Sequence, residues 1–368
     1  MSDQVAPVSA RFPDFPWDTI AGAKRRAAEH PDGIVDLSIG TPVDATPAVA
    51  RQALLDAADA PGYPTVLGPT PVRQAAVDWL ARRAGVVGLE ADQVLLTIGS
   101  KELIANLPVQ LGLGVGDTVV IPELAYPTYE VGARYAGCEV VATDALTALG
   151  PARPALVYLN SPANPHGQVL GVDHLRKVVA WARERGTLVV SDECYLEFGW
   201  EAEPVSVLHP DVCDGSFDGL LAVHSLSKRS NLAGYRGGFV AGDRAVVAEL
   251  LAVRKHLGFM VPTPVQHAVA AALTDDEHVD RQVEVYRSRR AALRRAFEAA
   301  GFRVDHSEGS LYLWVTRDEP CRDTLDWLAE RGILVAPGDF YGANGGRHVR
   351  VSVMAADDRV EAAVARLA

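Results

Sequence analysis

The stretch Gly219-Leu220-Leu221-Ala222-Val223-His224-Ser225-Leu226-Ser227-Lys228 joins an apolar run to a group of polar side chains that follows it directly. The apolar run predicts a buried strand, and Lys228 comes after its end beside two hydroxyls, with Arg236 eight positions further on. A lysine amine in such a place can form a Schiff base with an aldehyde, and hydroxyls beside a guanidinium suit a bound phosphate. Pyridoxal phosphate carries both groups. A solvated Lys228-Arg229 pair in a loop is the alternative that this stretch alone leaves open.

Strand-like runs of the same kind precede this stretch along the chain. Residues 94–98, 118–121, 155–159 and 188–191 are apolar on both faces, as expected for a mostly parallel sheet that helices cover. Helical patterns lie between these runs, for example over residues 172–185, which end at Gly186. Strand–helix alternation over roughly 200 residues predicts an α/β layer with a doubly wound sheet.

The pattern changes after about residue 260. A long helical stretch covers about residues 277–300, and short strand-like runs follow at 311–315, 333–335 and 348–351. These elements predict a smaller α+β domain beside the large one. We expect a large cofactor-binding α/β domain over residues 46–262, and a small domain built from residues 1–45 together with residues 263–368.

Composition narrows the possible partners and the compartment. The 368 residues are 48% hydrophobic, and a net charge of -12 argues against a nucleic-acid or anionic-membrane partner. The cysteines Cys138, Cys194, Cys213 and Cys321 are scattered, which favours buried thiols over a disulfide framework or a zinc site. Residues 1–17 lack the features of a signal peptide, and no apolar run is long enough to span a bilayer. We therefore expect a cytoplasmic enzyme or regulator without a metal site.

Three polar residues follow the ends of predicted strands. Asn164 comes shortly after the run at 155–159, Asp192 directly after 188–191, and Ser225 directly after the apolar run that opens this section. Because ligands of open α/β sheets bind beyond the carboxyl ends of the strands, these residues predict one shared site. Loops also collect polar residues in general, and this is the competing interpretation.

Four motifs in chain order resemble those of the fold-type I, class I/II aminotransferases, and the resemblance covers nearly the whole chain. Residues 160–167 are similar to the family motif N-x-P-x-N-P-x-G, residues 191–195 to D-E-x-Y, residues 225–237 to S-x-S-K…G-x-R-x-G, and residues 349–352 to the C-terminal arginine motif. Intervals of 28, 36 and 8 residues separate Asn164, Asp192, Lys228 and Arg236, and these also fit the family. His166 departs from the pattern, since the family more often has threonine there. That substitution could touch specificity.

The resemblance implies a pyridoxal 5'-phosphate enzyme and a role for each matched residue. Lys228 would hold the cofactor and then act as the general base that moves a proton from the substrate Cα. Asp192 would pair with the pyridine nitrogen and keep it protonated. Tyr195 and Asn164 would hydrogen-bond the phenolic oxygen, with Asn164 also near the substrate. Arg350 would bind the substrate α-carboxylate in a bidentate pair, where the alternative is a strand arginine that faces solvent.

Donors for the phosphate are expected at the start of a helix. Gly99-Ser100-Lys101-Glu102 follows a predicted strand and opens a helical run, so backbone N–H groups can face an anion there. Ser100, Ser225, Ser227 and Arg236 would complete the phosphate site. For Lys101 we expect the backbone N–H to serve while the side chain points to water.

Three further positions match the family around the cofactor. Tyr126 matches the aromatic residue that stacks on the cofactor ring, and Gly40 lies in a segment similar to the N-terminal loop that closes over the substrate. Tyr63 matches a tyrosine that reaches the phosphate of the neighbouring subunit. The resemblance therefore implies a homodimer with shared active sites, acting on amino-acid and keto-acid substrates.

Within the family, four segments look most like actinobacterial-type N-succinyldiaminopimelate aminotransferases: residues 15–18, 66–71, 99–102 and 259–264. This resemblance implies transfer of an amino group from glutamate to N-succinyl-2-amino-6-oxopimelate, on the route to diaminopimelate and lysine. Such a substrate needs a basic distal pocket. Lys24, Arg25, Arg254 and Lys255 are candidates, although a solvated helix face explains each of them better.

Other functions remain open at this point. The same motifs suit an aspartate, alanine or aromatic aminotransferase, or a carbon–sulfur β-lyase in which Lys228 removes the proton and a β-substituent leaves. Residues 188–193 resemble a Walker B strand, but no G-x-x-x-x-G-K-[ST] motif accompanies them. A DNA-binding sensor would need a further module, and only about 40 residues without a basic arm precede Gly40.

Overall fold

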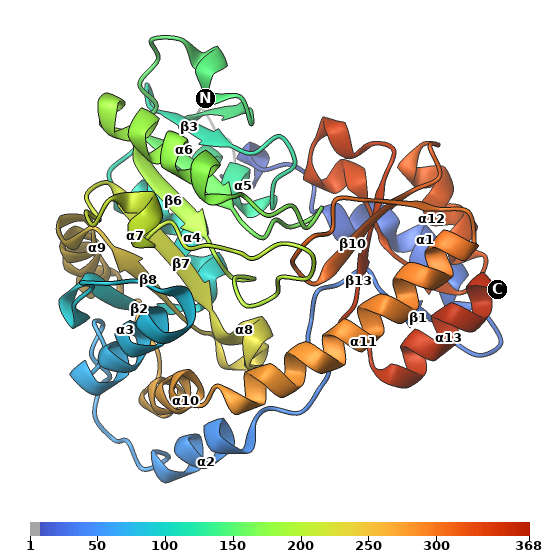
Figure 1. Cartoon of the computed structure of the whole chain (residues 1–368), viewed down its shortest axis with the longest axis horizontal. Coiled ribbons are helices and arrows are strands. Elements are labelled where there is room, and N and C mark those ends of the chain that lie inside the picture. The colour runs from blue at the N-terminus through green and yellow to red at the C-terminus, as the bar shows by residue number, and fades with distance from the viewer. Residues whose placement is uncertain (1–7) are drawn as a thin grey trace, which may run out of the picture.

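The computed structural model describes residues 8–368, so the first seven residues of the predicted small domain lie outside the description. Its largest sheet has seven strands in the order β2-β8-β7-β6-β5-β3-β4 (Figure 1). The bounds are β2 Val94–Ile98, β3 Thr118–Ile121, β4 Glu139–Ala142, β5 Leu156–Asn160, β6 Leu188–Asp192, β7 Leu220–Ser225 and β8 Gly237–Gly242. Only β8 runs antiparallel to its neighbours β2 and β7 in this sheet. The expected mostly parallel α/β sheet is thus confirmed. The glycine-rich strand β8 was not among the strands predicted from the sequence.

Helices cover both faces of this sheet, which explains why its strands are apolar on both sides. One face packs against α4 Gly99–Gln110, α5 Thr128–Ala136 and α9 Arg244–Leu257. The other face packs against α2 Ala48–Asp56, α3 Thr70–Ala84, α6 Val172–Arg185, α7 Pro210–Cys213, α8 Leu226–Arg229 and α10 Thr263–Thr274. Neighbouring strand residues join different cores, Val189 on one side and Val190 on the other.

A smaller α+β part lies beside the large sheet (Figure 1). Its antiparallel sheet has the order β12-β13-β10-β9, with β9 Arg303–Asp305, β10 Tyr312–Thr316, β12 Ala336–Pro337 and β13 Val349–Ser352. Around it lie α1 Ala21–Ala28, α11 Glu277–Ala299, α12 Cys321–Ala329 and α13 Asp357–Leu367. The N-terminal segment joins this part, because β1 Val35–Asp36 pairs in parallel with β11 Ile333–Leu334. The domain limits expected at residues 45/46 and 262/263 remain a prediction.

Short 3-10 helices connect these elements. They span Val8–Arg11, Pro16–Ile20, Ala91–Gln93, Leu146–Leu149, Ala233–Tyr235, Gly338–Tyr341 and Ala343–Gly345. Over residues 8–368 no helix has both the length and the apolar character needed to cross a membrane.

The register of the parallel strands sets the position of the site. Asn160 at the end of β5 lies opposite Asp192 at the end of β6, and Asp192 lies opposite Val223 of β7. Ser225 and the short helix α8 continue from the same edge. The three strand-end segments that the sequence indicated therefore meet at one carboxyl edge, as the doubly wound topology requires.

Candidate active site

A cavity of about 310 Å³ opens at this carboxyl edge, between the large sheet and the smaller part. All but one of the predicted site residues line it: Gly40, Ser100, Lys101, Tyr126, Asn164, Asp192, Tyr195, Ser225, Ser227, Lys228, Arg236 and Arg350. They come from segments up to 310 positions apart in the chain (Gly40 to Arg350). The tertiary structure thus brings together the four motifs that the sequence shows separately.

Asp192 forms one wall of the cavity as a buried carboxylate. Its Oδ2 accepts a hydrogen bond from the Tyr129 hydroxyl at 2.8 Å, and its Oδ1 accepts one from the Cys194 amide at 3.2 Å. Burial raises the pKa of Asp192, while hydrogen bonds from Cys194 and Tyr129 and the charge of Lys228 oppose that rise. A carboxylate held in this way is well suited to pair with a cation in the cavity.

Lys228 lies on the four-residue helix α8, which Ser225 caps. The Ser225 Oγ accepts from the Ser227 amide at 3.2 Å and lies 2.9 Å from the Ser227 Oγ. The cap holds both hydroxyls at the cavity wall next to the half-buried lysine. The chain therefore presents one amine and two hydroxyl groups within a single helical turn.

The start of α4 and Arg236 meet at the same end of the cavity. Gly99 has φ 69°, and a Cβ built on it would lie 2.5 Å from the Arg236 Nη2. Glycine at this position therefore leaves the space that the guanidinium occupies beside the first turn of α4. With Ser100, Ser225 and Ser227 nearby, backbone N–H groups and a fixed cation converge as an anion site. Lys101 is exposed, as expected, although it also contributes to the cavity wall.

Arg350 approaches the cavity from β13 and is only 3% exposed, which excludes a strand arginine that faces solvent. Its Nη1 donates to Asn164 Oδ1 at 2.9 Å and its Nη2 to the Ser38 carbonyl at 2.6 Å. The guanidinium carbon lies 4.0 Å from the centre of the Tyr312 ring. Within residues 8–368 its buried Nε has no hydrogen-bond partner, so the guanidinium at the cavity wall keeps one unused donor.

Tyr195 and Gly40 both meet Tyr312, a residue that the sequence did not single out. The Tyr195 and Tyr312 hydroxyls lie 3.0 Å apart, and burial raises the pKa of Tyr195 well above its usual value. A side chain on Gly40 would collide with the Tyr312 hydroxyl, so only glycine lets the N-terminal loop approach the cavity here. Tyr312 lies within a predicted strand, and nothing local in that strand marks it as functional.

An aromatic group supports the carboxylate wall. Tyr126 lines the cavity, and burial raises its pKa to about 12. Its ring meets Tyr129 edge to face at 5.8 Å, and Tyr129 stacks on Tyr158 at 4.7 Å. Tyr129 then hydrogen-bonds Asp192, so the tyrosine expected to cover a cofactor ring and the carboxylate are fixed by one cluster.

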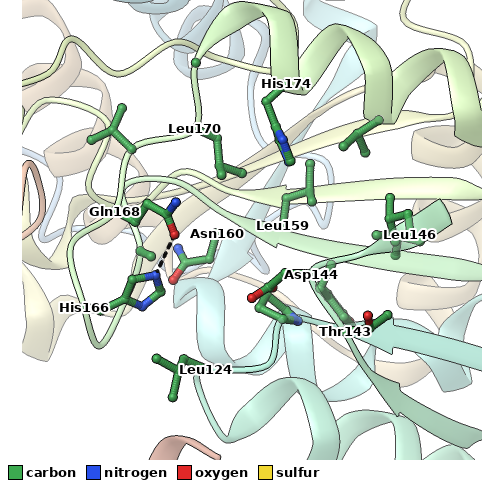
Figure 2. A pocket seen from close by; sticks show the side chains of 17 residues that line it. Leu124, Thr143, Asp144, Leu146, Leu159, Asn160, His166, Gln168, Leu170 and His174 are labelled. Carbon is green, nitrogen blue, oxygen red and sulfur yellow. Dashed lines mark hydrogen bonds between the residues drawn. The ribbon is translucent and has the colours of Figure 1, made fainter. Parts of the chain in front are cut away.

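The loop after β5 contributes to the walls of both the active-site cavity and a second cavity, and Figure 2 shows the second one. Asn160 lines both cavities, and its Oδ1 accepts a hydrogen bond from the Asn164 amide at 2.7 Å. His166 faces only the second cavity, of about 290 Å³, where its Nε2 lies 3.1 Å from Gln168 Oε1 (Figure 2). The departure from the family motif at His166 is therefore behind the reactive cavity and outside its wall.

The family model for aminotransferase class I and II matches residues 32–367 of this chain. The chain belongs to this family. This aminotransferase is accordingly a pyridoxal-phosphate-dependent enzyme that acts on amino and keto acids, and its sheet and covering helices are those of fold type I.

The aminotransferase is similar to proteins of the family, two of which carry different substrates in their names. It is 65% identical to the probable aminotransferase Rv1178 of Mycobacterium tuberculosis, over 98% of this chain and 86% of the relative. It is 57% identical to the 4-dedimethylamino-4-oxo-anhydrotetracycline transaminase OxyQ of Streptomyces rimosus, over 97% and 99% of the two chains. A solved structure of a probable N-succinyldiaminopimelate aminotransferase from Thermus thermophilus matches with a TM-score of 0.86 at 29% identity, over 96% and 99%.

The side chains of this aminotransferase fit its cofactor. A buried carboxylate can face a protonated ring nitrogen, and the hydroxyls, Arg236 and the start of α4 can receive a phosphate. The space that Gly99 leaves for Arg236 shows that this end of the site is shaped around a cation. Lys228 lies in the same cavity as both groups, as covalent attachment of the aldehyde requires.

Some predicted positions of the aminotransferase lie away from the cavity. Tyr63 is 96% exposed and does not line it. Lys24, Arg25 and Lys255 are exposed, as expected for a solvated helix face. The same interpretation is wrong for Arg254, which is completely buried on α9 and pairs with Glu102.

Several cavity residues were not found from the sequence. These are Trp17, Ile39, Thr41, Asn160, Cys194, Ala233 and Tyr312. Asn160 and Cys194 lie inside two of the recognised motifs, so the sequence already indicated that they are near the site. Trp17 lies in residues 15–18, which the sequence marked as similar to part of the family but did not assign to the cavity. Tyr312 reaches the cavity only through packing between distant segments, which no local pattern indicates.

Proposed function

We propose that this aminotransferase transfers the amino group of glutamate to N-succinyl-2-amino-6-oxopimelate, as part of lysine and diaminopimelate biosynthesis. The observation that carries the reaction type is the convergence of Lys228, Asp192 and Arg350 on one cavity. Support for the substrate comes from the sequence segments described above and from the likeness to the Thermus thermophilus enzyme.

In this proposal the residues around the cofactor have separate chemical roles. Bound pyridoxal phosphate supplies an aldehyde for the substrate amine and a ring that withdraws electrons from the reacting carbon. Asp192 keeps a positive charge on the ring nitrogen, and Lys228 takes the proton from the substrate Cα and later returns one. Tyr195 and Asn164 hydrogen-bond the ring oxygen.

The remaining residues bind and orient. Arg350 holds the substrate α-carboxylate, so that the Cα–H bond faces Lys228. Ser100, Ser225, Ser227, Arg236 and the backbone N–H of Lys101 bind the phosphate, and Tyr126 covers the ring. Gly40 lets the N-terminal loop close over the substrate.

We further propose that the enzyme is a homodimer. Among residues 8–368, the cations that line the cavity are Lys101, Lys228, Arg236 and Arg350, and the roles above use the charge of each except Lys101. The proposed substrate has two distal carboxylates, so the exposed Lys101 ammonium cannot pair with both, and a neighbouring subunit would supply a further group. The almost fully exposed aromatic ring of Tyr63 supports a contact in which it reaches the phosphate of that subunit.

A second candidate substrate class has its own support. The 57% identity to a transaminase named for an oxo-anhydrotetracycline favours a bulky ring ketone as the acceptor. The aromatic and apolar cavity residues Trp17, Ile39, Tyr126 and Tyr312 suit such a ring better than a chain with several carboxylates. Aspartate, alanine and aromatic acceptors, and β-elimination, are further alternatives.

A panel of acceptors with glutamate as the donor tests the substrate. We expect the highest kcat/KM for the succinylated six-oxo acid, with oxaloacetate, pyruvate, phenylpyruvate and a polycyclic ketone as comparisons. A preference for any of these comparisons would contradict the proposed substrate and leave the reaction type intact. Pyruvate release from cystathionine without amino transfer would instead indicate a β-lyase.

Replacement of the lysine tests the reaction type. Lys228→Ala should abolish turnover and prevent borohydride from fixing the cofactor to the chain, while circular dichroism stays that of the wild type. The matched control is Lys101→Ala, which removes an exposed amine from the same cavity and should keep both turnover and the borohydride adduct. Near-normal transamination by Lys228→Ala would show that the proposed role is wrong.

The expected cytoplasmic location remains a prediction.

A further inference from the structure

Two ionisable side chains lie directly behind the cofactor-facing residues and take no part in the proposed reaction. Glu193 follows Asp192 at the end of β6, and His224 precedes Ser225 at the end of β7. Side chains alternate along a strand, so Glu193 and His224 lie on the face of the sheet opposite Asp192 and Ser225. The Glu193 amide donates to the Val223 carbonyl at 2.9 Å, which extends the pairing of the two strands to this point.

The two side chains are buried against each other. Their side-chain exposures are 0% for Glu193 and 4% for His224, and Glu193 Oε2 lies 3.4 Å from His224 Nε2. Glu193 Oε1 accepts a hydrogen bond from the Val207 amide at 2.7 Å. The Oε2 and Nε2 atoms are buried, and neither forms a hydrogen bond of ordinary geometry in the described part of the chain. The hydroxyls of Ser191 and Ser206 also face the Glu193 carboxyl. Oε2 and Nε2 therefore remain available to each other.

The surroundings disfavour an ion pair here. The His224 ring packs between Trp79 and Phe239, at 5.1 and 5.0 Å between ring centres. The charged or ionisable groups around the pair are Arg229 of α8, Glu197, Cys194 and Asp192. Arg229 pairs with Glu197, and among the described residues no ion pair joins Arg229 to Glu193.

Burial acts on both groups in the direction of neutrality. It raises the pKa of Glu193 to about 7, and burial together with the charge of Arg229 lowers the pKa of His224 to about 3. When both groups are neutral, the Glu193 carboxyl carries one proton, and its Oε2–H can donate to Nε2 of the imidazole. If both groups were charged, the attraction across the single 3.4 Å contact would have to offset the free-energy cost of removing two ions from water.

We propose that Glu193 and His224 share one proton and act as a positioning pair that links the ends of β6 and β7. The pair fixes the spacing of Asp192 and Ser225, which face the pyridine and phosphate ends of the site. It also keeps a second negative charge from forming behind Asp192 below about pH 7. Only this consequence for the cofactor rests on the proposed roles of Asp192 and Ser225, because the shared proton is a property of the folded chain itself.

Infrared difference spectroscopy of the full-length holoenzyme tests the shared proton directly. We expect a protonated-carboxyl band at pH 6 that is lost as the pH rises through about 7, and that is absent from Glu193→Gln. His224→Phe keeps an aromatic ring at this position but removes the hydrogen-bond acceptor of Glu193, so it should move the loss of the band to lower pH. If wild type and Glu193→Gln have identical carboxyl bands at pH 6, or if His224→Phe leaves the midpoint unchanged, the proposal is wrong.

Cofactor release tests the positioning role. Glu193→Gln keeps an acceptor for the Val207 amide and a donor for His224, so cofactor dissociation should remain at the wild-type rate. Glu193→Ala loses both and should release the cofactor about tenfold faster, because buried polar atoms lose their partners. Equal dissociation rates for all three proteins would contradict positioning. Failure of the proposed function would show itself differently, as absent transamination by the wild type with the infrared band still present.

Discussion

At the scale of single residues, burial decides the charge of several side chains near the site. His166 is an example, because it stands where the family more often has threonine and lies in the wall of the second cavity (Figure 2). It is 8% exposed, and burial lowers its pKa to about 4. Its ring also meets His306 edge to face at 5.3 Å, which joins the loop after β5 to the smaller part.

The lowered pKa of His166 predicts acid sensitivity. A histidine in the unfolded chain has a pKa near 6.5. Between about pH 6.5 and 4, His166 is therefore protonated in the unfolded state and neutral in the folded state. The stabilising contribution is complete above about pH 6.5 and is lost as the pH falls toward 4, by up to about 3 kcal/mol. His166→Thr should therefore lose less stability than the wild type between pH 7.5 and 4.5, as measured by urea unfolding. Parallel losses in the two proteins would contradict this prediction.

At the scale of elements, buried polar contacts hold the helix that begins at the phosphate end of the cavity. Arg254 of α9 donates to both carboxylate oxygens of Glu102, in the first turn of α4, at 2.9 Å each. It also donates to Gln110 at the other end of α4, at 3.2 Å. The ion pair therefore fixes the helix whose N-terminus carries Ser100 and Lys101. The buried Arg254 is thus a structural residue and has no place in a distal substrate pocket.

Removal of this arginine should destabilise the protein strongly. Arg254→Met leaves Glu102 without its partner, and we expect a loss of about 3–5 kcal/mol in the free energy of unfolding. The matched control is the double variant Arg254→Met/Glu102→Met, which removes both charges and should recover most of the loss. Denaturant unfolding monitored by circular dichroism measures both. A single variant as stable as the wild type would show that the pair contributes nothing to the fold.

At the scale of the whole molecule, the cavity exists only because two parts of the chain meet. Strand β6 and helix α8 of the large part supply Asp192 and Lys228, while β13 and β10 of the smaller part supply Arg350 and Tyr312. Figure 1 shows these elements. The hydrogen bond from Arg350 to Asn164 crosses between them. Tyr63 is the one predicted site residue that this single chain does not bring to the cavity, and the proposed dimer explains its position.

Mixed dimers test that proposal. Tyr63→Ala and Lys228→Ala should each be poorly active alone, but a mixture that is allowed to exchange subunits should regain about one quarter of wild-type activity. The reason is that a hybrid dimer has one site with its own Lys228 and the partner's Tyr63 intact. The matched control mixes Lys228→Ala with Asp192→Ala, and no activity should return because both residues belong to the same chain's cavity. If the Tyr63→Ala mixture also stays inactive, Tyr63 does not act across subunits.

Much of the fold followed from local patterns in the chain. The strands β2, β3, β5, β6 and β7 and the helix α6 lie where apolar runs and helical spacing placed them, since burial on both faces leaves a continuous apolar signal. The antiparallel β8 was not predicted, because its glycines carry no such signal and only pairing with β2 and β7 makes it a strand.

The site residues also fall into two groups: those that the sequence identified and those whose positions only the tertiary structure could decide. The sequence by itself determined the family and the chemistry available at Asn164, Asp192, Lys228, Arg236 and Arg350, because each lies within a short motif that can be recognised locally. Only the tertiary structure decided that Tyr312 joins the cavity, that Arg254 is buried against Glu102 and that Tyr63 stays outside. Such outcomes depend on contacts between segments hundreds of residues apart, and burial, which sets charge and hydrogen bonding, arises only when those segments pack.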